Sequence, residues 1–335
     1  MLRCSSRHHK TGLRLPDISA LNGTAIANLA EVDGLTVSGG GSSFTGLLDQ
    51  TYGTGAAAAY SVRRLSSSTG ALIRVRRVTG VGNTGNDDEA DFSYDSNNEL
   101  SLNSPISNAD AGVNSTTLGS FLNVGTVSGV TYPDTDSLSN TAEGYCDSWY
   151  DQSGNSNDAT QSTPGSQPQI HGGTVNTDLN TVNGKPNLVW TNDSLTFASS
   201  LVSNPMAVFH VKDVPSNQYF LRDSITSYVW AYLYSSQIRT RLGNMLNIDS
   251  GKTFSNVQSL LTFIKKGVVG VSSIHYKDGV NQYTAGYEGL DAQTGTLTSL
   301  GAYSGNAQEF VFYDIDKTSN RTDIENNMNS HFQIY

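Results

Sequence analysis

Charged residues are scarce in this sequence. They make up 15% of its 335 residues, against about 25% in ordinary soluble domains. Acids outnumber bases: there are 30 Asp and Glu against 20 Lys and Arg, which gives a formal net charge of −10. Proteins that bind nucleic acid normally carry a basic stripe that displaces counterions from phosphates. We therefore expect no nucleic-acid partner.

Cysteines and long apolar runs are also rare. The two cysteines, Cys4 and Cys146, are far apart and show no CxxC spacing, so we expect neither an intrachain disulfide nor a zinc site. No stretch reaches the roughly 18 to 20 apolar residues of a membrane span, and no apolar run follows the basic residues before Asp17. We expect no membrane insertion, no secretory signal, no metal and no cofactor.

Small and polar residues fill the sequence instead, with 33 Gly and 16 Tyr among abundant Ser, Thr and Asn. This mixture favours short strands and tight turns over long helices. Many short strands of this kind predict an all-β fold, an antiparallel β-sandwich with a few short helices. Strands are expected near residues 71–78, 205–211, 228–234, 268–276 and 309–313, the fourth of them leading into a hairpin turn at Asp278-Gly279.

Two segments are expected to be helical. Residues 56–65, AAAAYSVRRL, combine a run of helix-favouring alanines with apolar residues on one side. Residues 320–331 carry apolar side chains at every fourth position, and Thr322 and Glu325 have the spacing of a capping box.

The first fifty residues have a character of their own. A short motif, apolar residues around Asn22-Gly23, recurs eleven residues later around Asp33-Gly34, and both dipeptides favour tight hairpins. The tract at 38–43, SGGGSS, is typical of a flexible linker. Two small hairpins cannot bury a core alone, so we expect residues 1–50 to form an attachment arm and residues 51–335 the main domain.

Several strings resemble known families. AAYSVRRLSSSTGALIRVRR at 58–77, SWYDQSGNSNDATQ at 148–161 and QPQI at 167–170 resemble the concanavalin A-like sandwich of α-L-arabinofuranosidase B catalytic domains, and of phage and marine bacterial proteins that share the module. GKPNLVW at 184–190 and the segment 309–335 resemble the opening and closing elements of laminin-G-like jelly rolls. The repeat around Asn22-Gly23 is similar to repeats at the N-termini of phage structural proteins.

The resemblance implies a jelly-roll body and a place on a phage particle. It suggests a tail fibre, spike or capsid decoration protein in the virion, joined to other virion proteins through the arm, homo-oligomeric, and displaying a body that binds cell-surface glycan. Two alternatives remain: a capsid or tail building block that binds no ligand, and a glycoside hydrolase related to the arabinofuranosidases. Their glutamate-bearing catalytic segment and their disulfides have no counterpart in this sequence, so no catalytic residue is carried over.

The segment around YDQSGN supplies the candidate ligand-binding residues. Sugar binding needs aromatic faces together with planar polar groups that fix hydroxyls. The expected set is Trp149, Tyr150, Asp151, Asn155 and Asn157. Two other interpretations fit the same loop. Asp151 also suits turn chemistry, with Gly154 at positive φ and the two asparagines in left-handed conformations. The oxygens of Asp147, Asp151 and Asp158 also suit Ca²⁺, although not at EF-hand spacing.

The remaining chemical groups are expected to be structural. A retaining glycosidase needs two carboxyls about 5–5.5 Å apart, one of them kept protonated. Only Glu288 and Glu309 lie near late strands, and neither is paired with an Asp by spacing. The acidic run from Asp87 to Asp91 is expected to be a solvated loop, with cation binding as the alternative. Alternating aromatics at 228–234 are expected to form a buried strand face, and His210 and His275 are expected to be structural.

Overall fold

The computed structural model describes residues 44–79, 87–202, 205–213, 257–266, 274–283 and 296–335, together with the backbone of several short strands elsewhere. The chain divides into two compact units, Met1–Phe44 and Thr45–Tyr335. In the described part, no helix is both long and apolar enough to span a bilayer.

The first unit contains the two hairpins that the repeat predicts. β1 (Ala20–Leu21) pairs antiparallel with β2 (Thr24–Ala25), and β3 (Glu31–Val32) pairs antiparallel with β4 (Leu35–Thr36). The Gly/Ser tract at 38–43 lies outside the described residues.

The second unit starts before residue 51, at Thr45. A single-turn helix, η3 (Leu47–Asp49), buries Leu47 completely in the core of this unit. The Asp49 carboxylate accepts hydrogen bonds from the backbone N–H groups of Gly46 and Ser67. Residues 45–50 therefore belong to the second unit, and the boundary lies after residue 44 instead of after residue 50.

The second unit is an antiparallel β-sandwich, as the composition and the turn signals predict. One layer, sheet A, contains six strands in spatial order: β24 (Val280–Tyr283), β23 (Ile274–Lys277), β22 (Ser259–Lys265), β17 (Met206–Asp213), the second half of β25 (Thr296–Tyr313) and β5 (Ala56–Ser61). The hairpin between β23 and β24 turns at Asp278 and Gly279, which have φ of 51° and 74°. The Asp-Gly turn is therefore confirmed.

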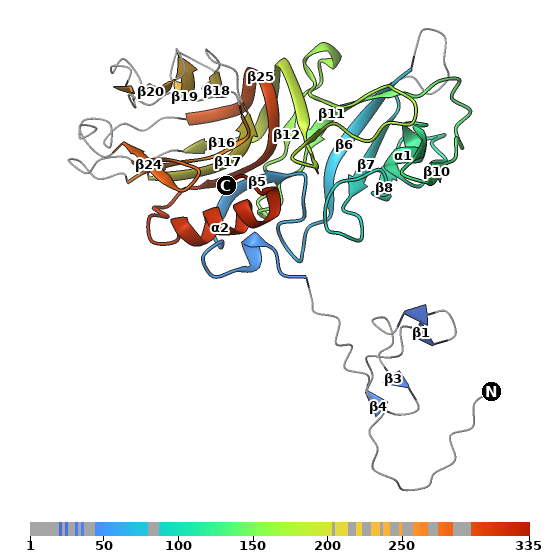
Figure 1. The fold of residues 1–335 in the computed structure, drawn as a ribbon, viewed down its shortest axis with the longest axis horizontal. Coiled ribbons are helices and arrows are strands. Elements are labelled where there is room, and N and C mark those ends of the chain that lie inside the picture. Colours follow the sequence, from blue (N-terminus) through green and yellow to red (C-terminus); the bar gives the residue numbers. More distant parts are fainter. Residues whose placement is uncertain are drawn as a thin grey trace, which may run out of the picture. The chain divides into compact units, whose positions relative to one another are not determined.

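The other layer, sheet B, is wider (Figure 1). Its strands in spatial order are β8 (Ile106–Ala109), β7 (Glu89–Ser93), β6 (Ala71–Val78), β11 (Glu143–Trp149), β12 (Ala159–Thr160) beside β13 (Gln169–Gly172), β16 (Leu188–Val202), the first half of β25, β18 (Tyr219–Arg222), β19 (Val229–Tyr234), β20 (Gln237–Arg241) and β21 (Ile248–Asp249). The smaller elements are α1 (Leu118–Phe121), β9 (Gly125–Val127), β10 (Val130–Tyr132), η4 (Pro164–Ser166), β14 (Thr181–Val182) and β15 (Lys185–Pro186).

β25 joins the two layers because it changes neighbours along its length. Residues 296–307 pair with β16, whereas residues 306–313 pair with β17 and residues 309–313 with β5. Gly301 lies in the part that pairs with β16, at φ 110°, where a Cβ would come within 2.4 Å of the Asp193 carbonyl oxygen. Glycine is needed there because both the backbone angle and the close approach exclude a side chain.

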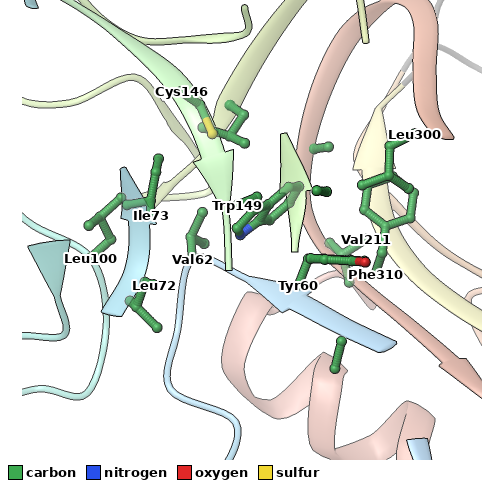
Figure 2. Close-up of a cluster of buried hydrophobic side chains, with 14 of the residues drawn as sticks. Tyr60, Val62, Leu72, Ile73, Leu100, Cys146, Trp149, Val211, Leu300 and Phe310 are labelled. Atoms are coloured by element: carbon green, nitrogen blue, oxygen red, sulfur yellow. The ribbon is translucent and has the colours of Figure 1, made fainter. Parts of the chain in front are cut away.

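Aromatic side chains from both layers meet in the core (Figure 2). The Trp149 ring of β11 lies 6.1 Å from the Tyr60 ring of β5 and 6.0 Å from the Phe310 ring of β25. The Phe197 ring of β16 stacks on Tyr60 at 5.6 Å. α2 (Arg321–Phe332) packs against β17 and β22 and buries Ile324, so sheet A is covered on its other face as well.

The predicted helix at 56–65 is wrong, because residues 56–61 form strand β5. Ala58 and Ala59 are fully buried in this strand, which pairs with β25 along one edge and forms hydrogen bonds with the Tyr150–Asn155 loop along the other. Tertiary packing overrides the helix propensity of alanine. The C-terminal helix is confirmed, but its N-cap is Asn320, so the Thr322 capping box does not form.

The other predicted strands are confirmed at 71–78, at 206–211, at 229–234 and at 309–313. The predicted strand at 268–276 begins at Ile274, and its earlier residues lie outside the described part. The side chains of the aromatic run in β19 and residue Tyr228 also lie outside it. Cys146 is a buried free thiol, and Cys4 belongs to the residues that are not described.

Candidate functional site

The alternation of β6 sends its arginines to different environments. Ile73 and Val75 point into the sandwich and are buried. Arg74 and Arg76 therefore lie on the opposite face of sheet B, because successive strand residues alternate in direction. Their cross-strand partners on β7 are Asp91 and Glu89. We call this surface the arginine face: it comprises Arg74, Arg76, Asp87, Glu89, Asp91, Asp110, Glu143, Tyr145, Asp147, Tyr150, Gln167 and Gln169.

Arg74 is the centre of the arginine face. Its Nε donates to Glu89 at 2.7 Å, one terminal nitrogen donates to Asp91 at 2.9 Å, and the other donates to Asp110 at 3.0 Å. The three carboxylates come from β7 and from the turn after β8, so one planar guanidinium fixes acceptors from two chain segments. They stay partly exposed, from 12% for Asp91 to 44% for Asp110.

Arg76 extends this network along β6. Its Nε donates to the Gln167 side-chain oxygen at 2.7 Å and a terminal nitrogen donates to Asp87 at 2.6 Å. The guanidinium carbon lies 5.3 Å from the centre of the Tyr145 ring, a cation–π contact. Gln167 also donates to Asp147 at 3.1 Å, which connects β6 to the bulge in β11.

The third arginine of β6 faces the interior. Arg77 donates to Asp88, to Asp136 and to the Phe121 carbonyl, and its side chain is 1% exposed. The acidic run at 87–91 is therefore not a solvated loop. Each of its four acids pairs with an arginine of β6, because β6 and β7 are antiparallel neighbours. The positive charges beside this run are therefore guanidinium groups of the same chain.

Tyr150 is the one predicted ligand-binding residue that lies on the arginine face. Its hydroxyl donates to Asp91 at 2.7 Å, on the same carboxylate oxygen that accepts from Arg74. Burial, followed by the hydrogen bond to Asp91, raises the pKa of Tyr150 well above its usual value. The phenol therefore stays protonated and keeps donating to Asp91, which orients the ring.

Asp151 and Asn155 have a structural role beside β5. Asp151 accepts from the backbone N–H groups of Ala59, Ser153 and Asn157 at 2.8, 2.9 and 3.0 Å. The Asn155 amide donates to the Ala56 carbonyl at 2.9 Å. This is the predicted turn chemistry of Asp151, and Gly154 has the expected positive φ of 88°. The left-handed residue after it is Ser156, at φ 56°, rather than Asn155 or Asn157.

Gln152 completes this cover of the β5 edge. Its backbone N–H donates to the Ala59 carbonyl, and its side-chain amide donates to the carbonyls of Ser61 and Arg63. Its side-chain oxygen accepts from the Leu65 N–H at 2.7 Å. Three loop side chains therefore replace a neighbouring strand along β5. An exposed strand edge is a site of unwanted pairing, and this loop closes it.

The other predicted ligand-binding residues lie in the interior. Trp149 is 1% exposed and packs in the core, so its ring offers no face to a sugar (Figure 2). Asn157 is 4% exposed; its side-chain oxygen accepts from the Ser199 N–H at 2.6 Å, and its carbonyl accepts from Tyr60. The structure thus brings Tyr150 to the arginine face and leaves the other four in the core or along β5.

The carboxylates and histidines considered for other chemistry occupy varied positions. Glu309 is fully buried in an ion pair with Arg63 and accepts from Ser61, which excludes it from contact with a large substrate. Glu288 lies outside the described residues. Burial, with the nearby Asp151 charge, raises the pKa of Asp158. His210 and His275 are buried in β17 and β23, in the strands where the sequence predicts them. Across the described ranges, no group of three or more His, Cys, Asp or Glu side chains is arranged to hold a metal ion.

The sequence interpretation placed Glu89 and Asp91 in an acidic run but did not connect them with Arg74, and it missed Gln152. A usable signal existed for the first three: Arg74 and Arg76 are two residues apart, as are Glu89 and Asp91. Equal spacing of two on adjacent strands places opposite charges on the same face, where cross-strand pairs form. Gln152 gave no such signal, because its role depends on the path of the loop beside β5.

Comparisons with known proteins agree with this architecture. No family model matches the chain, and no curated protein matches it. A solved GH54 α-L-arabinofuranosidase, soaked with a cyclic sulfate inhibitor, aligns with a TM-score of 0.50 and 16% identity, covering 82% of this chain and 62% of the arabinofuranosidase. A mutant of a GH54 α-L-arabinofuranosidase, soaked with 4-nitrophenyl α-L-arabinofuranoside, aligns with a TM-score of 0.51, 14% identity and the same coverage.

These likenesses establish the fold. The second unit is a lectin-like antiparallel β-sandwich similar to the one in GH54 arabinofuranosidases, and the chain spans less than two thirds of the length of those structures. The binding domain of Paraclostridial Mosquitocidal Protein 1 is a looser match, with a TM-score of 0.42, 13% identity and coverage of 55% of this chain and 50% of that domain. It adds nothing to the fold assignment.

Proposed function

We propose that the chain is a carbohydrate-binding protein that takes glycan on the arginine face and does not hydrolyse it. The observation that carries this proposal is the set of three carboxylates that Arg74 holds on one partly exposed surface. Sugar hydroxyls need acceptors in fixed positions, and acceptors that are fixed before binding lose little conformational entropy on binding.

Two tyrosines support the same interpretation. Tyr150 donates to Asp91 and keeps oxygen lone pairs for a sugar hydroxyl. Tyr145 lies opposite Arg76 on β11 and receives a hydrogen bond from Gln169 at 3.3 Å. Aromatic rings next to planar polar groups are the usual components of a sugar site.

The test is binding of the full chain to a glycan array, followed by titration of each hit with two matched variants. Tyr150→Phe removes the hydroxyl from the arginine face, and Tyr132→Phe removes a hydroxyl that donates to Asn103 elsewhere on the body. We expect Tyr150→Phe to weaken binding about fivefold, since a hydrogen bond between the neutral phenol oxygen and a sugar hydroxyl contributes roughly 0.5–1.5 kcal/mol. Tyr132→Phe should leave it unchanged. Equal affinities for both variants contradict the location of the site.

The alternative function is a glycoside hydrolase, which the fold likeness to two arabinofuranosidase structures favours. Incubating the full chain with nitrophenyl arabinofuranosides and with plant arabinan separates the two functions. The binding proposal predicts no sugar release above that of a boiled sample. Release that depends on Glu288 or on Asp158 would establish the hydrolase instead.

We also propose that the first unit attaches the body to a phage particle, through its two hairpins. The support is the repeated hairpin motif in a unit separate from the body, and its similarity to repeats of phage structural proteins. Immunogold labelling of gradient-purified particles with an antibody to the full chain tests the attachment. Labelled particles support it, and a chain found only in the particle-free fractions contradicts it.

A further inference from the structure

The arginine face carries an excess of negative charge. Two guanidinium groups, those of Arg74 and Arg76, stand against six carboxylates. These carboxylates belong to Asp87, Glu89, Asp91, Asp110, Glu143 and Asp147. A partly exposed surface with this balance repels anions and attracts cations over about a Debye length, roughly 10 Å at 0.1 M salt.

The positive groups on this face already donate within the protein. All three nitrogens of the Arg74 guanidinium donate to carboxylates, at 2.7 to 3.0 Å. The three nitrogens of Arg76 donate to Gln167, to Asp87 and to the Pro164 carbonyl. Recognition of a carboxylate or sulfate needs a guanidinium fork that faces the ligand. Neither arginine presents that fork, because both are turned toward neighbouring side chains.

The groups that remain available are acceptors. Glu89 binds Arg74 through Oε2, and within the described part of the chain no group donates to its Oε1. Its side chain is 27% exposed, and that of Asp87 is 66% exposed. A carboxylate oxygen accepts a hydrogen bond from a hydroxyl or an ammonium group but repels another carboxylate. The ligand must therefore supply donors.

We propose that the arginine face selects glycans by charge, so that it binds neutral or amino sugars and rejects uronic, sialic and sulfated ones. This rests on the proposed function and adds the ligand class to it. Selectivity comes from repulsion of the wrong ligand as well as from attraction of the right one, because unpaired anions that meet across a binding surface are costly.

The experiment measures binding of the full chain to three groups of polymers in low salt. The neutral probes are galactan, xylan and mannan, the amino probe is chitosan, and the acidic probes are polygalacturonate and alginate. We expect the tightest neutral or amino polymer to bind at least tenfold more tightly than either acidic polymer. The ratio should fall in 0.5 M NaCl, because salt screens the repulsion.

A double variant, Glu89→Gln with Asp110→Asn, removes two of the six charges and keeps the shapes of the side chains. We expect it to strengthen binding to polygalacturonate about tenfold relative to the wild type, roughly threefold for each partly exposed charge. Asp314→Asn is the matched control, because it removes an exposed charge at the end of β25 and should change nothing.

The outcomes separate the two proposals. Equal or tighter binding of polygalacturonate or alginate by the wild type overturns charge selection and leaves glycan binding intact. Equal binding of polygalacturonate by the double variant and by Asp314→Asn also overturns it, since the selecting charges then lie elsewhere. Binding to none of the six polymers, and to nothing on the glycan array, overturns glycan binding and the charge selection with it.

Discussion

The Asp151 carboxylate accepts the backbone N–H of Ala59 at 2.8 Å, across 92 positions of sequence. Ala59 belongs to the string AAYSVRRL and Asp151 to the string YDQSGN, so two separate motifs form one structural unit. The loop supplies the hydrogen bonds that a neighbouring strand would give to the outer edge of β5. The motif that first suggested ligand binding therefore protects a sheet edge.

Replacing Asp151 with alanine should destabilise the body strongly. Four hydrogen bonds end on this carboxylate, from the N–H groups of Ala59, Ser153 and Asn157 and from the Ser153 hydroxyl. We expect the free energy of unfolding to fall by about 3 kcal/mol, because buried donors are left without partners. Urea denaturation of the full chain measures the change.

Asp316→Ala is the control for this variant. Asp316 also accepts from a backbone N–H and a hydroxyl, those of Thr318, but its turn is exposed and joins no distant segments. Asp316→Ala should lower the free energy of unfolding by less than about 1 kcal/mol. Equal urea midpoints for the two variants would mean that the loop does not support β5.

The Arg63–Glu309 pair should behave as a buried salt bridge. The Nε to carboxylate distance is 2.7 Å, the side chains are 9% and 0% exposed, and Arg63 also donates to Asn327 of α2. Arg63→Met and Glu309→Gln should each lower the free energy of unfolding by about 3–5 kcal/mol, because each leaves its partner without compensation. The decrease in the free energy of unfolding of the double variant should be clearly smaller than the sum of the two single decreases. Additive decreases would show that the two groups act independently.

Asp136 should make the body sensitive to acid. Burial raises the pKa of Asp136, but hydrogen bonds from Ser115, from Arg77 and from the Asn114 N–H outweigh burial and hold the pKa below its usual value. A carboxylate with a lowered pKa in the folded state stabilises the fold above its unfolded pKa of about 3.9, and this stabilisation is lost as pH falls through the folded value.

The variant Asp136→Asn tests whether the charge of Asp136 stabilises the folded state. At pH 7 it should be less stable than the wild type toward urea, and the difference should shrink as the pH is lowered from 5 to 2.5. A difference that stays constant over this range would assign the effect to shape or packing rather than to charge.

The sequence predicted the fold class well because strand signals are local. Alternation around Arg74 and Arg76 indicated β6, and the Asp-Gly dipeptide indicated the turn at Asp278. The helix predicted at 56–65 was wrong for a non-local reason. Residues 56–61 form a strand because β25 pairs with one edge of the segment and the Tyr150–Asn155 loop hydrogen-bonds to the other, and propensity alone carries no information about those distant neighbours.

The site was harder to predict than the fold. Trp149 and Tyr150 are adjacent in sequence, yet one ring lies in the core and the other reaches Asp91 on the outer face. Adjacent strand residues point in opposite directions, but the sequence does not say which direction is inward. The register between β6 and β7, which matches Arg74 to Asp91, depends on the folded sheet as a whole.

A crystal structure of the full chain soaked with an oligosaccharide of its tightest neutral or amino polymer tests the central claim most directly. The account predicts electron density for sugar over β6, β7 and β11, with hydroxyl or amino groups within hydrogen-bond distance of Glu89 and Tyr150. Ordered sugar bound elsewhere on the sandwich, with the arginine face empty, would contradict it.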